Sequence, residues 1–449
     1  MSEPTEEPTT AEETAAEEPK PTPAASAVEE KVRTGIRPRT AKRLAIMAVL
    51  LVGISYALYW FVGQKGDIIF PIDSSKMIAA LKLDEGSQAV VIDPSGKVTA
   101  SSGYTAENTD RDLAWQPDGN RLFFISDRMN SGYQIFRWNP ASNGDPDQRS
   151  VDRASRSDLS FDAQETGKGD LMGLVIVRGT VHRFEPKTSK STPVMPPSKQ
   201  TSSDPEGGQT GTFEVLYKRY GQSFKTARWF GHRRYIAAVM KREDRGESLI
   251  VQDSEPDDQG RMRPPRLVFI AEKINIAVDP VSGGLVFTLT DVLPILDDQG
   301  NPVEGPDGKP IKYGFNHAIL RTVDQGGNLG MQMIGASPSK ELCFASPVVS
   351  PDGNSMMFLA GKYKGEGNME VTSLNSCPFV ENGIQGASLL VPGIVTDPTF
   401  SPNGRQIAFV KEDGGKQAIF LATSNGSDVK NLTGSSGNFA TPLFSPQYK

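Results

Sequence analysis

The densest group of side chains that could bind a ligand lies between Lys218 and Arg266, where twelve cations face seven carboxylates. A local excess of positive charge favours docking to an anionic envelope polymer, to lipid head groups or to an acidic protein. An ordinary solvated edge is nevertheless the preferred interpretation, because Glu243, Asp244 and Glu247 lie among the cations and would neutralise much of their field. The candidate binding set consists of Arg228, Arg233, Arg234, Lys241, Arg242, Arg263 and Arg266.

Residues suited to metal-ion or acid–base chemistry are few. The only histidines are His182, His232 and His317, and the repeat described below assigns two of them to third strands and one to a turn. Ligands so dispersed do not converge on one ion, so we expect no metal site. No stretch fits a Ser nucleophile elbow, a phosphate-binding loop or a paired-His zinc helix. The sequence therefore predicts no catalytic residue, no cofactor and no enzyme activity.

Three carboxylates, Asp112, Asp158 and Asp397, occupy the same position of a repeated strand motif, at its start. Around a common channel such carboxylates could hold a cation. Alternatively they cap backbone amides where the strand begins, which short polar side chains also do. The second interpretation is favoured because four repeats have an uncharged residue there, namely Thr226, Asn275, Ser346 and Thr441.

Cys343 and Cys377 are the only cysteines of the chain. An even pair in an exported protein is compatible with a disulfide. Their places in the repeat put them toward opposite faces of the disc, which argues against a bridge, and the Cα separation is the deciding quantity. The sequence leaves this pairing open.

A repeated strand and turn organise these residues. The motif has a short polar residue, an apolar strand residue such as Trp115 or Phe400, and then a turn. The turns fall at 117, 163, 231, 280, 351, 402 and 446, so the intervals are 46, 68, 49, 71, 51 and 44 residues. A four-stranded blade needs about 40–50 residues, and the two long intervals contain the insertions 186–212 and 291–312. The spacing predicts seven blades, with six or eight as alternatives.

Each motif continues as a hairpin. Pro-Asp-Gly at 117–119 and 351–353, and Pro-Asn-Gly at 402–404, predict primed turns in which two central residues have positive φ. Apolar runs such as 122–125 and 407–410 follow, as expected for strands covered on both faces by neighbouring blades.

The phrases Val349-Ser350-Pro351-Asp352-Gly353 and Thr399-Phe400-Ser401-Pro402-Asn403-Gly404, with the ending Asn431-Leu432-Thr433, resemble the TolB-type, WD-like propeller repeat of bacterial exported proteins. The resemblance implies an all-β propeller that binds another protein or an envelope component on one face. It is strongest in the first, fifth and sixth repeats.

The two ends of the domain complement each other. Residues 76–101 supply three strands without an innermost one, and the chain end supplies only an innermost strand at 441–445. Pairing them would close a composite blade and remove an open sheet edge. Residues 447–449 lie past that strand and are expected to contribute little.

The N-terminal region has a different character. Residues 1–30 contain nine Glu, one Lys and five Pro, which predicts a disordered tail, and six cations follow between 31 and 43. Residues 44–63 carry no charge and are long enough for one transmembrane helix. The basic collar and the aromatic residues Tyr56 to Phe61 at the other end of the span predict a cytoplasmic N-terminus. A cleaved signal peptide is the alternative.

We therefore expect a tail and collar at 1–43, a helix at 44–63, a linker at 64–75 and the propeller at 76–449. The formal charge of −6 leaves −4 for residues 64–449, which argues against nucleic-acid binding. The predicted function is a non-catalytic, membrane-tethered scaffold outside the cytoplasm that binds a protein or an anionic envelope component. The alternatives are an extracytoplasmic propeller hydrolase or lyase, and a transmembrane signal transducer.

Overall fold

The computed structural model of the 449-residue chain describes most of the C-terminal part. The expected tail, collar, transmembrane helix and linker lie outside the described residues, as do Asp158 and Arg263. Within the described part no helix is long and apolar enough to cross a membrane. The described residues are 77–83, 86–103, 109–129, 132–149 without 143, 160–161, 172–195 without 178, 223–242, 245–255, 265–295, and 302–448 without 305–307, 309–312, 326–327 and 338.

Antiparallel sheets make up almost all regular structure, and five of those described have four strands. The strands near the N-terminus lie where the sequence predicts them. The five sheets are β1 (Ile78–Leu83), β2 (Ser87–Ile92) and β3 (Val98–Ser101) with β27 (Phe439–Phe444); β4 (Asp110–Trp115), β5 (Leu122–Ser126), β6 (Gln134–Trp138) and β7 (Asp147–Gln148); β8 (Ser160–Phe161), β9 (Gly173–Val177), β10 (Thr180–Glu185) and β11 (Lys190–Met195); β19 (Leu342–Val349), β20 (Ser355–Gly365), β21 (Asn368–Pro378) and β22 (Ser388–Pro392); and β23 (Val395–Phe400), β24 (Gln406–Asp413), β25 (Lys416–Thr423) and β26 (Lys430–Asn431).

The sixth sheet has seven strands in chain order, because one long strand serves both of its halves. Strand β15 pairs with β14 through its first residues, up to Ala271, and with β16 through its later ones. A short 3-10 helix, η2 (Gly383–Gly386), follows β21. The strands of this sheet are β12 (Ser223–Phe230), β13 (Tyr235–Lys241), β14 (Glu247–Asp253), β15 (Arg266–Val278), β16 (Leu285–Leu293), β17 (His317–Gln325) and β18 (Asn328–Ser337).

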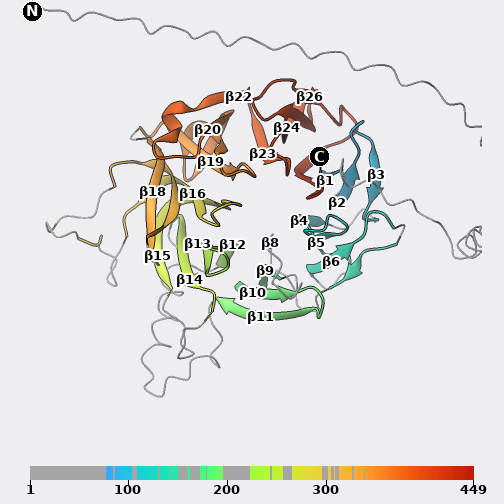
Figure 1. Cartoon of the computed structure of the whole chain (residues 1–449), viewed down its shortest axis with the longest axis horizontal. Helices are drawn as coiled ribbons and strands as arrows, with labels where there is room; N and C mark the ends of the chain where they lie inside the picture. Colours follow the sequence, from blue (N-terminus) through green and yellow to red (C-terminus); the bar gives the residue numbers. More distant parts are fainter. Residues whose placement is uncertain are drawn as a thin grey trace, which may run out of the picture. The chain divides into compact units, whose positions relative to one another are not determined.

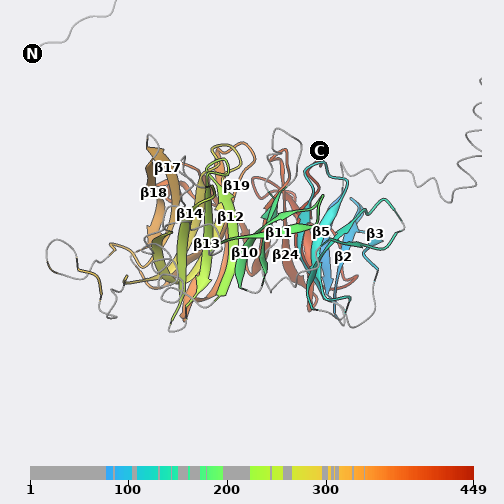
Figure 2. The same cartoon turned by 90° about the horizontal axis from the view of Figure 1, so that it is seen from below.

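The sheets surround a common centre, with β4, β12, β19 and β23 on the inside (Figure 1). Seen from the side, most strands run through the thickness of the domain (Figure 2). The hydrophobic clusters lie between neighbouring sheets: one joins Ala79 and Val91 of the first sheet to Trp115 and Phe124 of the next. Because the second strands are covered on both faces, runs such as Leu122–Ser126 are buried throughout. This arrangement is a β-propeller.

The C-terminal strand belongs to the first sheet. Strand β27 pairs antiparallel with β1, with Phe444 opposite Ile78. Residues beyond β27 contribute more to the packing of the domain than the sequence predicts. Tyr448 is 9% exposed, its ring centroid is 4.5 Å from that of Phe444, and its hydroxyl donates to Gln406 Oε1 at 2.8 Å. The expectation that 447–449 contribute little is therefore wrong, because the chain turns back at Ser445 and packs against the neighbouring sheet.

The predicted primed turns are also wrong. Gly119, Gly353 and Gly404 have φ near +70°, but the Asp or Asn before each glycine does not have positive φ. In the first turn Gly119 N donates to Gln116 O at 2.8 Å, and Gln116 N donates to Arg121 O at 2.8 Å. This is a type I turn followed by a left-handed glycine. The physical reason is the proline at the first central position, whose ring fixes φ near −65°.

Four strands that begin a repeat share one irregularity. Asp112, Ser346, Asp397 and Thr441 have φ between +47° and +54°, and each lies where the register with the next strand shifts. The sequence places the two aspartates at the start of their strands, whereas both are third residues, in β4 and β23. A bulge re-aims the side chain at that point of the strand, which a repeat pattern alone does not reveal.

Candidate functional site

The candidate cations do not form one surface. Arg233 and Arg234 lie in the turn after β12, whereas Lys241 and Arg242 lie at the far end of β13. That strand spans seven residues, which places its ends about 20 Å apart. Arg266 begins β15 with its guanidinium 6.0 Å from the ring of Tyr235, close to Arg234. In the middle of β12, Arg228 donates to Ala227 O at 3.0 Å.

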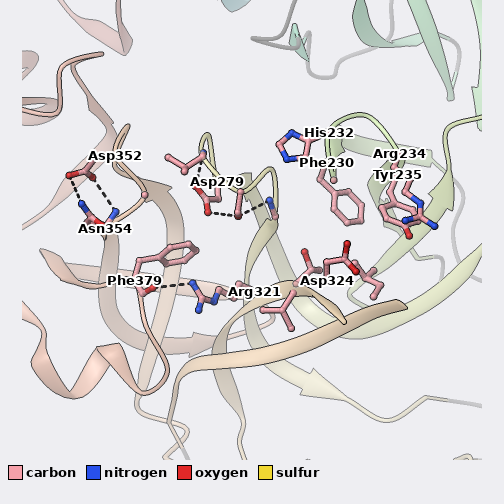
Figure 3. A pocket seen from close by; sticks show the side chains of 18 residues that line it. Phe230, His232, Arg234, Tyr235, Asp279, Arg321, Asp324, Asp352, Asn354 and Phe379 are labelled. Atoms are coloured by element: carbon pink, nitrogen blue, oxygen red, sulfur yellow. Dashed lines mark hydrogen bonds between the residues drawn. The ribbon is translucent and has the colours of Figure 1, made fainter. Parts of the chain in front are cut away.

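One predicted residue, Arg234, lines a pocket of about 610 Å³. The pocket is formed by three turns, which follow β12, β15 and β19, and by the end of β17 (Figure 3). We call it the three-turn pocket. Its walls include the aromatic rings of Phe230, Tyr235 and Phe379. Both halves of the seven-stranded sheet and the sheet after it therefore contribute to this site.

Close backbone contacts fix the spacing of the three turns. Gly231 N donates to Gly283 O at 2.6 Å, which joins the turn after β12 to the turn after β15. A Cβ on Gly283 would lie 3.0 Å from His232 N, and a Cβ on Gly353 would lie 3.0 Å from Val281 Cγ2. Both glycines also have positive φ. A larger residue at either position would push the turns apart.

Two arginines line the pocket without a carboxylate partner among the described residues. Arg321 is oriented by Nε, which donates to Gln332 Oε1 at 2.7 Å, and by Nη1, which donates to Phe379 O at 3.0 Å. Its Cζ atom is also 4.7 Å from the ring centroid of Phe379. The Cζ atom of Arg234 is 5.2 Å from the ring centroid of Tyr235. Aromatic faces hold guanidinium planes in place without neutralising their charge.

Two carboxylates of the pocket are occupied within their own turns. Asp279 is 4% exposed and accepts from Val281 N at 2.9 Å and from Ser282 Oγ at 2.5 Å. Asp352 accepts from Ser350 Oγ at 2.5 Å and from Asn354 N at 3.1 Å. The hydrogen bond from Ser350 and those from Asn354 lower the pKa of Asp352, so it stays ionised. These side chains shape the turns, and a third carboxylate, Asp324, also lines the pocket (Figure 3) without an ion pair to either arginine being found among the described residues.

The geometry suits recognition of an anion that carries an apolar part. Planar guanidinium groups bind carboxylate and phosphate oxygens through paired hydrogen bonds. Val281, which lines the pocket and is 57% exposed, supplies apolar contact, whereas the rings of Phe230 and Phe379 are almost fully buried. The sequence identifies Arg234 but not Arg321 or Phe379, which come from β17 and from the segment after β21. No local motif marks either residue.

The remaining candidates are dispersed. His182 lies on β10, His317 on β17 and His232 in the turn after β12, as predicted, and no group of three or more potential ligands is found among the described residues. Asp397 Oδ2 accepts from Thr441 N at 3.1 Å, which agrees with a capping role. Asp112 lies 3.9 Å from Arg111 Nε.

The two cysteines are buried and not bridged. Cys343 pairs with Gly361 and Cys377 with Met356 on the same strand, β20. Five residues of extended strand correspond to about 17 Å, too far for a disulfide. Burial raises the pKa of each thiol to about 11, so neither is a reactive thiolate at neutral pH.

No protein-family model matches the sequence, and the comparison with curated proteins gave no match either. Solved structures similar to this one include TolB from Acinetobacter baumannii, at 14% identity and a TM-score of 0.46, covering 83% of this chain and 67% of that one. Oligogalacturonate lyase from Vibrio parahaemolyticus has 10% identity and a TM-score of 0.47, covering 80% and 86%. A prolyl endopeptidase has 15% identity and a TM-score of 0.47, covering 80% and 48%, so this chain spans about half of that protein. Similarities of this size do not assign an activity.

Proposed function

We propose that this protein is a non-catalytic binding module whose three-turn pocket holds an anionic segment of a protein or of an envelope component. The observation that carries the proposal is the presence of Arg321 and Arg234 in one aromatic-walled pocket without carboxylate partners among the described residues. A ligand anion would supply that partner. One charge-assisted hydrogen bond contributes about 1.5–3 kcal/mol, so each arginine is worth roughly a tenfold change in affinity or more.

The proposal extends to the architecture. We infer seven blades, because the seven-stranded sheet divides at β15 into two four-stranded halves that share this strand. The pairing of β27 with β1 supports a ring closed by the two ends of the domain. A closed ring leaves no unpaired inner edge, which is the usual reason for such a composite blade.

We further propose that residues 44–63 anchor the protein in a cell membrane, with the tail in the cytoplasm and the propeller outside. The support is the uncharged span, the basic collar before it and the aromatic residues at its end. The resemblance to TolB-type repeats is consistent with an extracytoplasmic scaffold. A function as a transmembrane signal transducer would use the same topology and would require a cytoplasmic partner for the tail.

Site-specific cross-linking tests the pocket. A photoreactive amino acid replaces Val281, which lines the pocket and is 57% exposed, in the full chain in its native membranes. Val429, which is 49% exposed and does not line the pocket, is the control position. We expect an adduct from position 281 that Arg321→Met abolishes and that is absent from position 429. Identical adducts from both positions, unchanged by Arg321→Met, would contradict the proposal.

The same preparation distinguishes the enzyme alternative. A hydrolase or lyase would cleave the captured segment, so shortened products would accumulate with time in the wild-type protein. In the Arg321→Met variant their formation would stop. A binding module leaves the segment intact. Mass spectrometry of the released adduct partner measures the difference.

A further inference from the structure

A second cationic site lies on the two strands that precede the pocket turns, near the start of β12 and in the middle of β15. Lys225 is on β12, five residues before Phe230, and Lys273 is on β15, six residues before Asp279. At about 3.3 Å per residue these lysines lie about 17 Å and 20 Å along their strands from the three-turn pocket. Strands β12 and β15 are in contact with each other. We call Lys225 and Lys273 the lysine pair.

Among the described residues a single carboxylate serves the lysine pair, and both of its oxygens are already used. Glu247, at the start of β14, is 7% exposed. Its Oε1 atom lies 2.6 Å from Lys225 Nζ, and its Oε2 atom accepts from Ile274 N at 2.7 Å. The backbone bond fixes the carboxylate beside the lysine pair and limits how far it can turn toward Lys273. One negative charge therefore faces two ammonium groups.

The neighbouring charges in the described part of the chain do not compensate for the second ammonium group. Glu272 precedes Lys273, but successive side chains of a strand point to opposite faces, and its carboxylate is bound by Arg245. Lys241 stands directly opposite Glu247 in the β13–β14 ladder, so it brings a third ammonium group to the same face. Burial and, next, the charge of Lys225 lower the pKa of Lys273, an effect that Glu247 only partly offsets. The uncompensated positive charge therefore disfavours the protonated form of Lys273.

We propose that the lysine pair is an oxyanion-binding site, which takes a phosphate or carboxylate group between the ammonium groups of Lys225 and Lys273. The bound anion supplies the missing negative charge. Binding is linked to protonation, because an anion favours the charged form of Lys273. Since Lys225 and Lys273 lie about 17 Å and 20 Å along their strands from the pocket turns, the site does not depend on the function proposed for that pocket.

Competitive acylation tests the site on the full chain. A limiting amount of an acetylating reagent reacts with unprotonated amines, and mass spectrometry gives the rate at each lysine. The probes are inorganic phosphate and acetate, each at constant ionic strength so that general screening does not change. We expect phosphate or acetate to slow acetylation of Lys273 at least fivefold while Lys362, an exposed lysine of β20, reacts unchanged.

Three variants separate the site from a general salt effect and from the three-turn pocket. Lys225→Met should weaken the protection of Lys273 about tenfold in anion concentration, whereas Lys362→Met should leave the protection unchanged. Arg321→Met, which removes a pocket arginine, should also leave it unchanged. Protection by phosphate alone indicates a phosphate ligand, and protection by both anions indicates a general oxyanion site. The proposal is overturned if neither anion protects Lys273, or if Lys362 is protected equally.

Discussion

The indole Nε1 of Trp115 donates a hydrogen bond to the carbonyl oxygen of Leu443, 3.1 Å away. The two residues are 328 positions apart in the sequence. Trp115 ends β4, and Leu443 lies in β27, opposite Ala79 of β1. The C-terminal strand is therefore held by backbone pairing on one side and by a side chain of the next sheet on the other.

Truncation of the C-terminus should destabilise the protein in two steps. Deleting 447–449 removes Tyr448, and loss of a large buried aromatic side chain costs about 3–5 kcal/mol. Deleting 441–449 also removes Phe444 and much of the pairing with β1, so we expect a larger loss, comparable with a typical total stability of about 5–15 kcal/mol. Urea unfolding measures both. As a control, Tyr448→Phe loses only the bond to Gln406, about 1 kcal/mol. Equal stability of both truncations and the full chain would refute this assignment.

A buried ion pair should contribute strongly beside the same sheets. Asp110 is 1% exposed and accepts from Arg128 Nη2 at 2.8 Å, from Ala89 N at 3.0 Å and from Ser102 Oγ at 2.6 Å. Asp110→Ala leaves these donors without their acceptor, and we expect a loss of about 3–5 kcal/mol in the free energy of unfolding.

Asp147→Ala is the matched control for Asp110→Ala. Its carboxylate contacts Arg137 and Arg149, but the side chain is 60% exposed. Exposed ion pairs contribute about 0–1 kcal/mol, so this variant should be nearly as stable as wild type. A similar loss for both variants in urea unfolding would show that burial does not set the strength of the Asp110 contacts.

His317 should make stability depend on pH. It is fully buried, and its Nδ1 atom accepts from Asp291 N at 3.0 Å. Burial lowers the pKa of His317, although the nearby Lys340 backbone and the charge of Asp291 oppose the change. The unfolded chain then binds more protons, so this stability is fully present above a pH of about 6.5 and is lost as the pH falls toward the folded pKa.

The pH dependence can be measured by urea unfolding between pH 7.5 and pH 5. We expect wild type to lose stability over this range and His317→Asn, which keeps a side-chain acceptor, to lose less. The same slope in both proteins would assign the effect to other groups.

Periodic features of the sequence predict the fold well. Turns at 117, 351 and 402 and the strands between them follow from proline, glycine and apolar runs, and so do the strand positions of His182 and His317. The prediction of primed turns is wrong because it rests on the glycine and does not take account of the proline two residues before it. The bulges at Asp112 and Asp397 have no signature in single-residue preferences, since the register shift depends on the partner strand.

The candidate site was harder to predict. Charge density points to Arg234, but it also groups residues at opposite ends of β13. Arg321 follows four buried residues of β17, and in the sequence it resembles an ordinary polar residue near the end of a strand. Phe379 resembles a core residue that follows β21. Only the meeting of three turns in space brings them together. Burial of Tyr448 likewise depends on a chain reversal that the last residues do not reveal.

Strand β15 runs without a break from Arg266 to Val278, and its two parts belong to different halves of one sheet. Where loops connect two sheets, either sheet can loosen while the other stays paired. Here a displacement of one half passes to the other through a single extended backbone. We expect β12 to β18 to open together, as one cooperative unit. The three-turn pocket draws walls from both halves, so its spacing should persist through local fluctuations elsewhere in the chain.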